Sequence, residues 1–261
     1  ARRAETPLIS PFAPLPVADA VGAFSLSGPD PSGAEVVARS AWDLGLERVA
    51  ILRPGTERAR IDSEAFSQVF QEAGGIVAQE VVYDPGATFF QAEFDQVGST
   101  SPDGLFLPLE PRDIQLLAPQ FTYYGLDTLG IQLLGTAGWT DEEIVQSVDS
   151  RHTDGVIAST TRITQDETEE FQRFRLRYEA LFQKSLRNEI PAYGYDAAVL
   201  LLEGLRANPR GPQELLEALE RIQDLAGATG HLTVEGNGIR RVPQLVRIQN
   251  HEMIYISSHM H

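Results

Sequence analysis

The segment RVAILRPGTERARIDSEAFSQVFQEAGGIVAQEVVY, residues 48–83, sets the expected fold class. Its two outer runs, 48–52 and 76–83, are rich in apolar and β-branched residues, which is typical of buried strands. The run between them, 61–75, has apolar residues at helical spacing. Strands that alternate with helices in this way form parallel βαβ units, so the segment predicts an α/β protein.

End signals support the helices on both sides of the first strand. Asp62 is the expected N-cap of the helix within 61–75, and Gly74 stands where a C′ glycine belongs. The stretch 32–45 predicts a similar helix that ends at Gly45. The side chains expected to face inward are Phe66, Val69, Phe70 and Ala73 in one helix and Val36, Val37, Ala41 and Leu44 in the other.

The alternation continues along the chain, with further buried strands expected over 104–109 and 131–135. The second of these runs leads into QLLGTAGW, 132–139, where small residues and one Trp follow a strand end. Glycines there either relieve backbone crowding or form the rim of a ligand cleft, since ligands of open α/β sheets bind beyond the carboxyl ends of the strands.

The second half of the chain is more helical. Two capping boxes, Thr140 with Glu143 and Thr164 with Glu167, predict helix starts. The second box precedes a stripe made by Phe171, Phe174, Tyr178 and Leu181.

An apolar helix and a hairpin turn are expected in the last third of the chain. The run 191–209 is apolar nearly all round, so we expect it to pack between two layers. Asn237-Gly238 predicts a β-hairpin.

Composition restricts the function. The 261 residues carry 37 Asp and Glu against 21 Lys and Arg, a net charge of -16, which disfavours binding to nucleic acid. There is no cysteine, and therefore neither a disulfide nor a thiolate site. No run of 18 apolar residues predicts a membrane span, and an exported form would have lost its signal peptide.

No pattern indicates catalysis or a cofactor. The five histidines show no metal-ligand spacing on a helix, and His259-Met260-His261 is expected to be a disordered tail. G-x-S-x-G, Walker A and G-x-G-x-x-G patterns are absent. Glu110, just past a strand end, is the one carboxylate expected near a cleft, with a solvated loop acid as the alternative. We therefore predict a protein that is not an enzyme, with no catalytic residue, no metal and no cofactor.

Seven segments, in order, resemble the type I periplasmic-binding-protein fold of branched-chain amino-acid receptors of ABC transporters. They are PLISPFA (7–13), LGLERVAIL (44–52), FSQVFQEAGGIVAQEVVYDPGAT (66–88), PDGLFLPL (102–109), DGVIAST (154–160), PAYGYDAAVLLLEGL (191–205) and GATGHLTVEGNG (227–238). The resemblance covers nearly the whole chain and implies a two-lobed α/β protein with parallel βαβ sheets. Within this superfamily, QLLGTAGW resembles the penicillin-binding-protein activators, envelope lipoproteins that stimulate peptidoglycan synthases.

The resemblance implies a ligand cleft between the lobes. Position at strand ends, rather than the resemblance, gives the residues expected to face this cleft. The expected ligand-binding residues are Ser10, Phe12, Ala13, Glu110, Ala137 and Trp139. In the amino-acid receptors, a Thr hydroxyl holds the ligand carboxylate and a Glu pairs with the ligand ammonium. The matching positions here are at or next to Pro14 and at Ala137, so we expect no binding of a free amino acid.

The resemblance also implies the division of the chain. Residues 1–24 and 154–210 are expected to form the remnant of the first lobe, and 25–153 with 211–261 the second lobe. The opening βα units of the family's first lobe have no counterpart in this sequence, so that lobe is expected to be incomplete. The chain is then a fragment, or upstream residues were not recorded, or a partner supplies the missing surface.

The leading functional interpretation is a non-catalytic, periplasmic envelope protein of the activator type. It would act through an envelope or membrane protein partner or by sensing a cell-wall ligand, and a lipid or the partner would anchor it. The alternatives are a solute-binding receptor of an ABC transporter and a structural subunit of a membrane protein assembly. In each case a small ligand in the cleft is compatible with the sequence.

Overall fold

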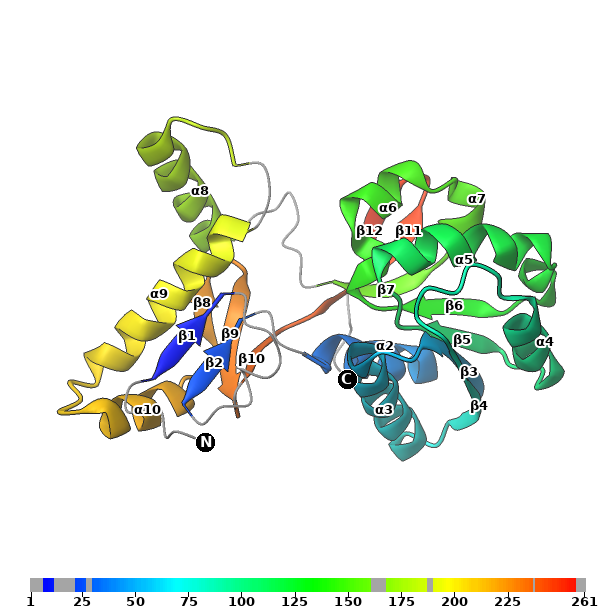
Figure 1. The fold of residues 1–261 in the computed structure, drawn as a ribbon, viewed down its shortest axis with the longest axis horizontal. Helices are drawn as coiled ribbons and strands as arrows, with labels where there is room; N and C mark the ends of the chain where they lie inside the picture. The colour runs from blue at the N-terminus through cyan, green and yellow to red at the C-terminus, as the bar shows by residue number, and fades with distance from the viewer. Residues whose placement is uncertain are drawn as a thin grey trace. The chain divides into compact units, whose positions relative to one another are not determined.

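A computed structural model describes residues 7–11, 22–26, 30–160, 168–186, 190–236 and 238–256 of the chain. The chain forms two compact α/β units (Figure 1). Unit 1 consists of residues 1–30 and 161–242, and unit 2 consists of residues 31–160 and 243–261.

These boundaries correct the expected division of the chain. Residues 25–30 and 211–242 belong to unit 1, and residues 154–160 belong to unit 2. The reason is strand pairing, because the strand at 157–160 is hydrogen-bonded inside the sheet of unit 2 and the strands between 225 and 241 complete the sheet of unit 1.

Unit 2 is built on a seven-stranded sheet. In sheet order its strands are β12 (Glu252–Ile256), β11 (Gln244–Gln249), β7 (Ile157–Thr160), β6 (Gln132–Gly135), β5 (Gly104–Leu107), β3 (Arg48–Pro54) and β4 (Ile76–Tyr83). The five strands from β7 to β4 pair in parallel, as the sequence predicted. Strand β11 pairs antiparallel with β7, and β12 pairs antiparallel with β11.

Helices cover both faces of this sheet (Figure 1). They are α2 (Ser32–Asp43), α3 (Glu57–Glu72), α4 (Gln91–Ser99), α5 (Pro111–Tyr123), α6 (Glu142–Ser147) and α7 (Ser150–Thr153), with 3-10 helices η1 (Leu126–Leu129) and η2 (Ala137–Thr140). Helices α2 and α3 share one apolar core with the sheet, and α4, α5 and α6 share the other. Two apolar faces thus bury the central strands.

The glycine stops of α2 and α3 are confirmed, but the expected N-cap of α3 is wrong. Gly45 and Gly74 have φ values of +81° and +109° directly after the helix ends. The N-cap of α3 is Thr56, whose hydroxyl accepts a hydrogen bond from the Ala59 amide at 3.4 Å. Asp62 lies inside the helix instead, because the residues after Thr56 extend the helix toward its N-terminus.

The other helix starts also differ from the expected capping boxes. Asp141 rather than Thr140 caps α6, with its carboxylate accepting from the Glu143 amide at 2.9 Å. Helix α8 (Glu169–Phe182) begins after Thr168, which accepts from the Phe171 amide at 3.2 Å. Thr164 and Glu167 lie outside the described residues.

The inward face of α2 also needs one correction. Val37 and Ala41 are fully buried, but Leu44 is 48% exposed because the helix ends before it.

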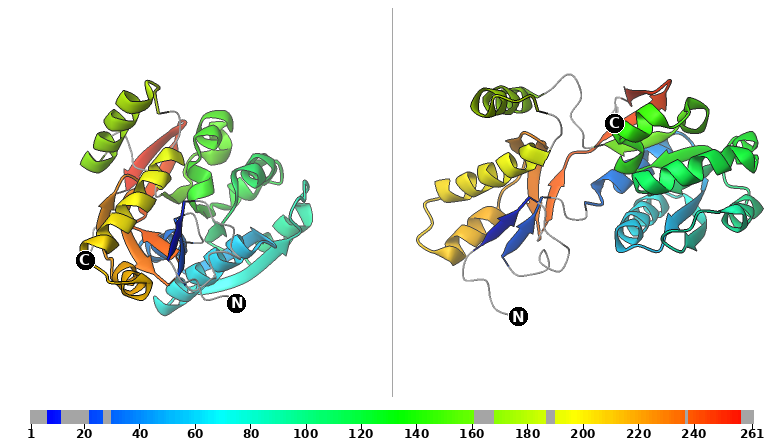
Figure 2. Two further views of the ribbon diagram at one scale, coloured as in Figure 1. Left: turned by 60° about the vertical axis from the view of Figure 1, so that its left-hand side comes forward. Right: turned by 45° about the horizontal axis from the view of Figure 1, so that its top comes forward.

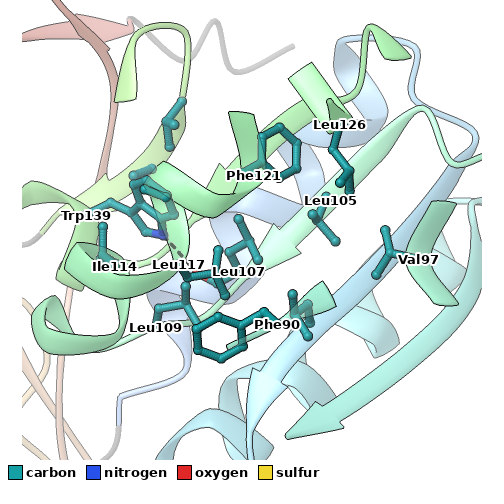
Figure 3. Packing of buried hydrophobic residues seen from close by; sticks show 14 of the residues in the cluster. Phe90, Val97, Leu105, Leu107, Leu109, Ile114, Leu117, Phe121, Leu126 and Trp139 are labelled. Atoms are coloured by element: carbon teal, nitrogen blue, oxygen red, sulfur yellow. Dashed lines mark hydrogen bonds between the residues drawn. The ribbon is translucent and has the colours of Figure 1, made fainter. Parts of the chain in front are cut away.

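Trp139 is a core residue of unit 2 (Figure 3). Its side chain is fully buried, and Nε1 donates a hydrogen bond to the Leu107 carbonyl oxygen at 3.0 Å. A Cβ on Gly135 would lie 2.2 Å from the Trp139 ring, and a Cβ on Gly138 would lie 2.0 Å from the Leu109 carbonyl oxygen. The small residues of QLLGTAGW therefore make room for the indole and for the adjacent backbone.

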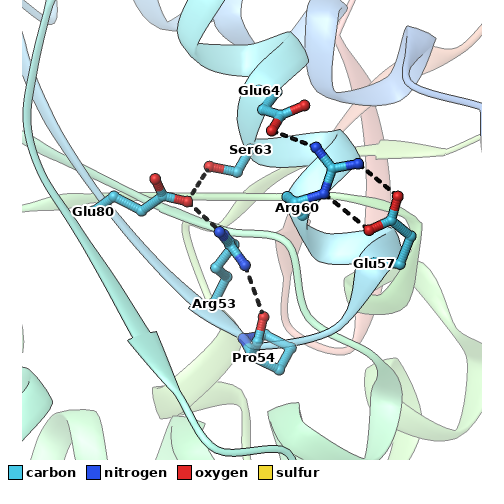
Figure 4. Close-up of polar contacts among 7 residues, drawn as sticks. All are labelled: Arg53, Pro54, Glu57, Arg60, Ser63, Glu64 and Glu80. Carbon is cyan, nitrogen blue, oxygen red and sulfur yellow. Dashed lines mark hydrogen bonds and ion pairs between the residues drawn. The ribbon is translucent and has the colours of Figure 1, made fainter.

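Polar contacts join α3 to the edge strand β4 (Figure 4). Arg53 of β3 pairs with Glu80 of β4, and the Ser63 hydroxyl of α3 donates to the Glu80 carboxylate at 2.8 Å. These contacts join α3 to two neighbouring strands of the sheet on whose face it packs.

Unit 1 has a mixed five-stranded sheet. In sheet order its strands are β1 (Leu8–Ser10), β2 (Ala23–Ser25), β10 (Gly238–Arg241), β9 (Gly230–Glu235) and β8 (Leu225–Gly227). Strands β1, β2 and β10 pair in parallel, and β8, β9 and β10 are antiparallel. The hairpin predicted near Gly238 is confirmed, although Asn237 lies outside the described residues.

Three helices pack with this sheet in unit 1 (Figures 1 and 2). They are α8, α9 (Ile190–Arg206) and α10 (Pro212–Glu220). Leu200 of α9 and Leu219 of α10 are buried against sheet residues. The other side of α9 is covered near its start, where Tyr195 packs on Phe174 of α8 with ring centroids 5.1 Å apart, and is open farther along, with Leu202 60% exposed. The expectation that this helix packs between two layers is thus met only over its first turns in the described structure.

The stripe predicted for α8 is confirmed only in part. Phe174 is buried, and Phe171 and Tyr178 pack against the same cluster. Leu181, expected on this stripe, is 76% exposed because it lies in the last turn of the helix.

A buried polar network ties β10 to α9 in unit 1. The Asp196 carboxylate accepts from the Thr229 hydroxyl at 2.5 Å and from the Ala228 amide at 2.6 Å. Arg241 Nε donates to the same Thr229 hydroxyl oxygen at 2.9 Å. Burial raises the pKa of Asp196, while these hydrogen bonds and the charge of Arg241 act in the opposite direction. Thr229 therefore links a buried carboxylate to a buried guanidinium.

Replacing Thr229 with Val should lower the free energy of unfolding by about 1–3 kcal/mol, because the change leaves buried donors and acceptors unsatisfied. Urea denaturation measures this. Thr88→Val, at an exposed threonine, is the control and should stay within about 0.5 kcal/mol of wild type. Equal stability of the two variants would contradict the role given to Thr229.

Replacing Gly138 with Ala should destabilise the chain by about 1–3 kcal/mol, because the new methyl group meets the Leu109 backbone rather than a flexible side chain. Gly98→Ala is the matched control in α4, where a Cβ meets nothing within 4 Å. Thermal melting should show a lower midpoint for Gly138→Ala and an unchanged or higher midpoint for Gly98→Ala.

Candidate functional site

A cavity of about 220 Å³ lies in unit 2 beyond the carboxyl ends of β3, β5 and β6. Three segments form it, and each directly follows one of these strands. The lining residues are Thr56, Arg58, Ala59, Asp62, Pro108, Leu109, Glu110, Pro111, Thr136, Ala137, Gly138 and Asp141. This is the place where open α/β sheets bind ligands.

Helix starts surround the cavity. Thr56 caps α3, Glu110 is the N-cap residue of α5, and Asp141 caps α6. Because the parallel strands end at one edge of the sheet, the helices that follow them begin there. The cavity therefore lies among helix N-termini, whose partial positive charge Asp141 offsets at α6.

The charged side chains of the lining differ in their surroundings. Asp62 is 5% exposed and forms an ion pair with Arg58, with Nε and Oδ2 3.8 Å apart. Glu110 is exposed, and within the described part of the chain its carboxylate has no hydrogen-bond or ion-pair partner. Glu110 is therefore the lining acid best placed to take a partner from a bound molecule.

The size and polarity of the cavity limit what it can hold. Drug-sized ligands occupy sites of about 300–1,000 Å³, so 220 Å³ suits a small solute. Hydroxyl, carboxylate and guanidinium groups line it beside the apolar carbons of Pro108 and Ala137. The arrangement can hold a small polar molecule by hydrogen bonds and ion pairs.

The structure brings together two of the predicted site residues, Glu110 and Ala137, which line this one cavity. Trp139 follows two residues after Ala137 but does not line the cavity. Its fully buried indole belongs to the core, which corrects the expectation that Trp139 faces a cleft.

The remaining predicted residues belong to unit 1. Ser10 ends β1, directly opposite Ser25 of β2, and its carbonyl oxygen accepts a hydrogen bond from the Leu26 amide at 3.0 Å. Phe12, Ala13 and Pro14 lie outside the described residues.

Thr56, Arg58, Asp62 and Thr136 also line the cavity and were not predicted as site residues. A signal for the first three was available, since they follow the predicted strand 48–52 within ten residues. The rule that ligands bind beyond strand ends would have selected them together with Glu110.

Two absences concern the described residues alone. In that part of the chain, His, Asp and Glu side chains form no group of three able to hold a metal ion. None of the described helices is both long and apolar enough to cross a membrane. His259, Met260 and His261 are outside this part of the chain.

Comparison with solved structures shows close similarity of fold. A leucine-binding protein from Thermotoga maritima has a TM-score of 0.73 and 20% identity, with 96% of this chain and 72% of that chain covered. A branched-chain amino acid transporter substrate-binding protein from Streptococcus pneumoniae, in complex with isoleucine, has a TM-score of 0.70 and 17% identity, with 96% and 72% covered. An ABC-transporter solute-binding protein from R. palustris, in complex with 4-hydroxybenzoate, has a TM-score of 0.75 and 17% identity, with 96% and 70% covered.

At these identities the structural similarity establishes the fold alone, which is the two-lobed type I periplasmic-binding-protein fold. No curated protein matches the sequence. The family model described as periplasmic binding protein matches residues 1–248, which is nearly the whole chain. The chain therefore belongs to the periplasmic-binding-protein family.

Proposed function

We propose that this protein is a periplasmic solute-binding receptor of an ABC transporter and that it binds a small polar solute without catalysis. The observation that carries the proposal is the polar cavity of unit 2 beyond the ends of three parallel strands. The similar structures are described as a substrate-binding protein of a branched-chain amino acid transporter and a solute-binding protein of an ABC transporter, which supports this function.

The lining argues against a free branched-chain amino acid as the solute. Ala137 offers only a methyl group at a position that the sequence resemblance assigns to an ammonium-binding Glu. Pro14 can supply neither a hydroxyl group nor an amide proton to a ligand carboxylate. A desolvated zwitterion lacking one partner loses about 3–5 kcal/mol. The Glu110 carboxylate remains the main charged group available to a solute other than a free amino acid.

Isothermal titration calorimetry with leucine, isoleucine and valine tests this selectivity. We expect each of them to bind with a Kd weaker than about 1 mM, or not at all, because both positions that pair with the ligand charges are altered. Micromolar binding of one of the three would contradict the selectivity while leaving a receptor function in place.

A thermal-shift screen against small amines, polyols, sugars and hydroxylated aromatic acids tests the receptor function itself. For an amine, polyol or sugar that raises the melting temperature, Glu110→Gln should weaken binding by about tenfold or more, because it removes a carboxylate that accepts charge-assisted hydrogen bonds. Glu252→Gln removes the same charge from an exposed site on β12 and should leave binding unchanged. Equal effects of the two variants would argue against the cavity as the solute site.

A second function, contact with a protein partner as in the activator-type proteins, is favoured by the apolar surface of α9. Leu201, Leu202 and Leu205 are 39%, 60% and 46% exposed in the described structure. Burying such side chains stabilises a contact by about 1.5–3 kcal/mol each. This surface is suited to a protein neighbour rather than to a small solute.

The 261-residue chain alone should therefore self-associate in sedimentation experiments. A Leu202→Gln and Leu205→Gln double variant should shift it toward monomer, because it removes apolar area from the exposed side of α9. A wild-type chain that is monomeric and melts sharply would contradict the proposed contact surface.

A further inference from the structure

A second exposed apolar surface lies in unit 2, formed by aromatic side chains around α4 and the end of α5. We call Phe89, Tyr123 and Tyr124 the aromatic patch. Phe89 is 66% exposed and Tyr123 is 81% exposed. Isolated exposed apolar residues are common, but several adjacent exposed rings mark an interaction site.

The three rings form one connected arrangement. The ring centroid of Tyr124 lies 6.0 Å from that of Phe89 and 5.0 Å from that of Tyr123, and both pairs are close to perpendicular. Tyr124 is half-buried and also packs on Phe94 of the core, with centroids 5.9 Å apart. The core therefore holds the patch in place before a partner arrives, which lowers the entropy cost of binding.

A carboxylate lies beside the rings of the patch. Asp95 of α4 helps to raise the pKa of Tyr124, together with burial, which is the larger cause, and with Tyr123. The whole chain has a net charge of -16. Exposed aromatic rings beside a carboxylate attract cationic side chains through both the ring faces and the charge.

We propose that the aromatic patch is a docking surface for a protein partner that presents arginine or lysine side chains. Tyrosine and arginine are enriched among the residues that dominate protein interfaces, and arginine stacks on aromatic rings. The net charge of -16 favours a cationic partner at this patch over an anionic lipid surface or a second copy of the chain, whose expected self-association uses the leucines of α9 instead. The aromatic patch shares no residue with the lining of the cavity, so a partner could bind the patch whether or not a solute is bound.

Hexa-arginine, hexa-lysine and hexa-glutamate peptides are suitable probes, with binding measured by fluorescence anisotropy at fixed salt. Hexa-arginine should bind more tightly than hexa-lysine, and hexa-glutamate should not bind. Phe89→Ser and Tyr123→Ser should each weaken hexa-arginine binding by about two- to fivefold, since each removes one cation–π contact. Both variants keep the net charge, so a uniform electrostatic attraction would leave their affinities unchanged.

Phe182→Ser is the matched control, because Phe182 is an aromatic residue 55% exposed on α8 of unit 1. It should bind hexa-arginine as the wild type does. Equal binding by wild type, Phe89→Ser and Tyr123→Ser would overturn the proposal. Binding of phosphatidylglycerol vesicles that Tyr123→Ser abolishes would assign the patch to a membrane, and a dimer that Tyr123→Ser dissociates would assign it to a second copy. Either result would also overturn it.

Discussion

The parallel pairing of β3, β5 and β6 is the constraint on which the candidate site depends. Ile51 pairs with Phe106, and Leu107 pairs with Gly135, so three strand ends lie at one edge of the sheet. The chain then starts a helix after each strand, and the three connections must pack at close range. Gly138 makes this packing fit, because its missing side chain lets η2 touch the Leu109 carbonyl. The cavity is the space that remains among these three connections.

Much of the fold of unit 2 could be predicted because local sequence patterns and tertiary packing agree there. The run 76–83 is a strand over its whole predicted length, and Gly45 and Gly74 end their helices as expected. Helix starts were less predictable, because Thr56 and Asp62 are both of types that cap helices and residue type favours Asp62, whereas the extended backbone is at Thr56. In unit 1, periodicity showed that the α9 segment is apolar on several sides but could not show which side the sheet would cover.

The candidate site was predicted in part for a similar reason. Glu110 and Ala137 follow strand ends, so the parallel topology alone brings them to one cavity. Trp139 also follows a strand end. Its side chain nevertheless points into the core, where it packs around Leu107, and the spacing of residues in the sequence does not show this direction. The surfaces of the protein also differ in chemistry, with a polar cavity and an exposed aromatic patch in unit 2 and exposed leucines in unit 1. The proposed solute and the proposed protein partners would therefore bind at different places.

We propose that a small solute binds among the connections after β3, β5 and β6. Amide chemical-shift mapping by NMR, during titration with a solute that stabilises the protein, tests this most directly. We expect the largest shifts at Thr56, Glu110 and Ala137, which come from three separate connections of one cavity. Saturable binding that leaves these three amides unchanged would contradict it.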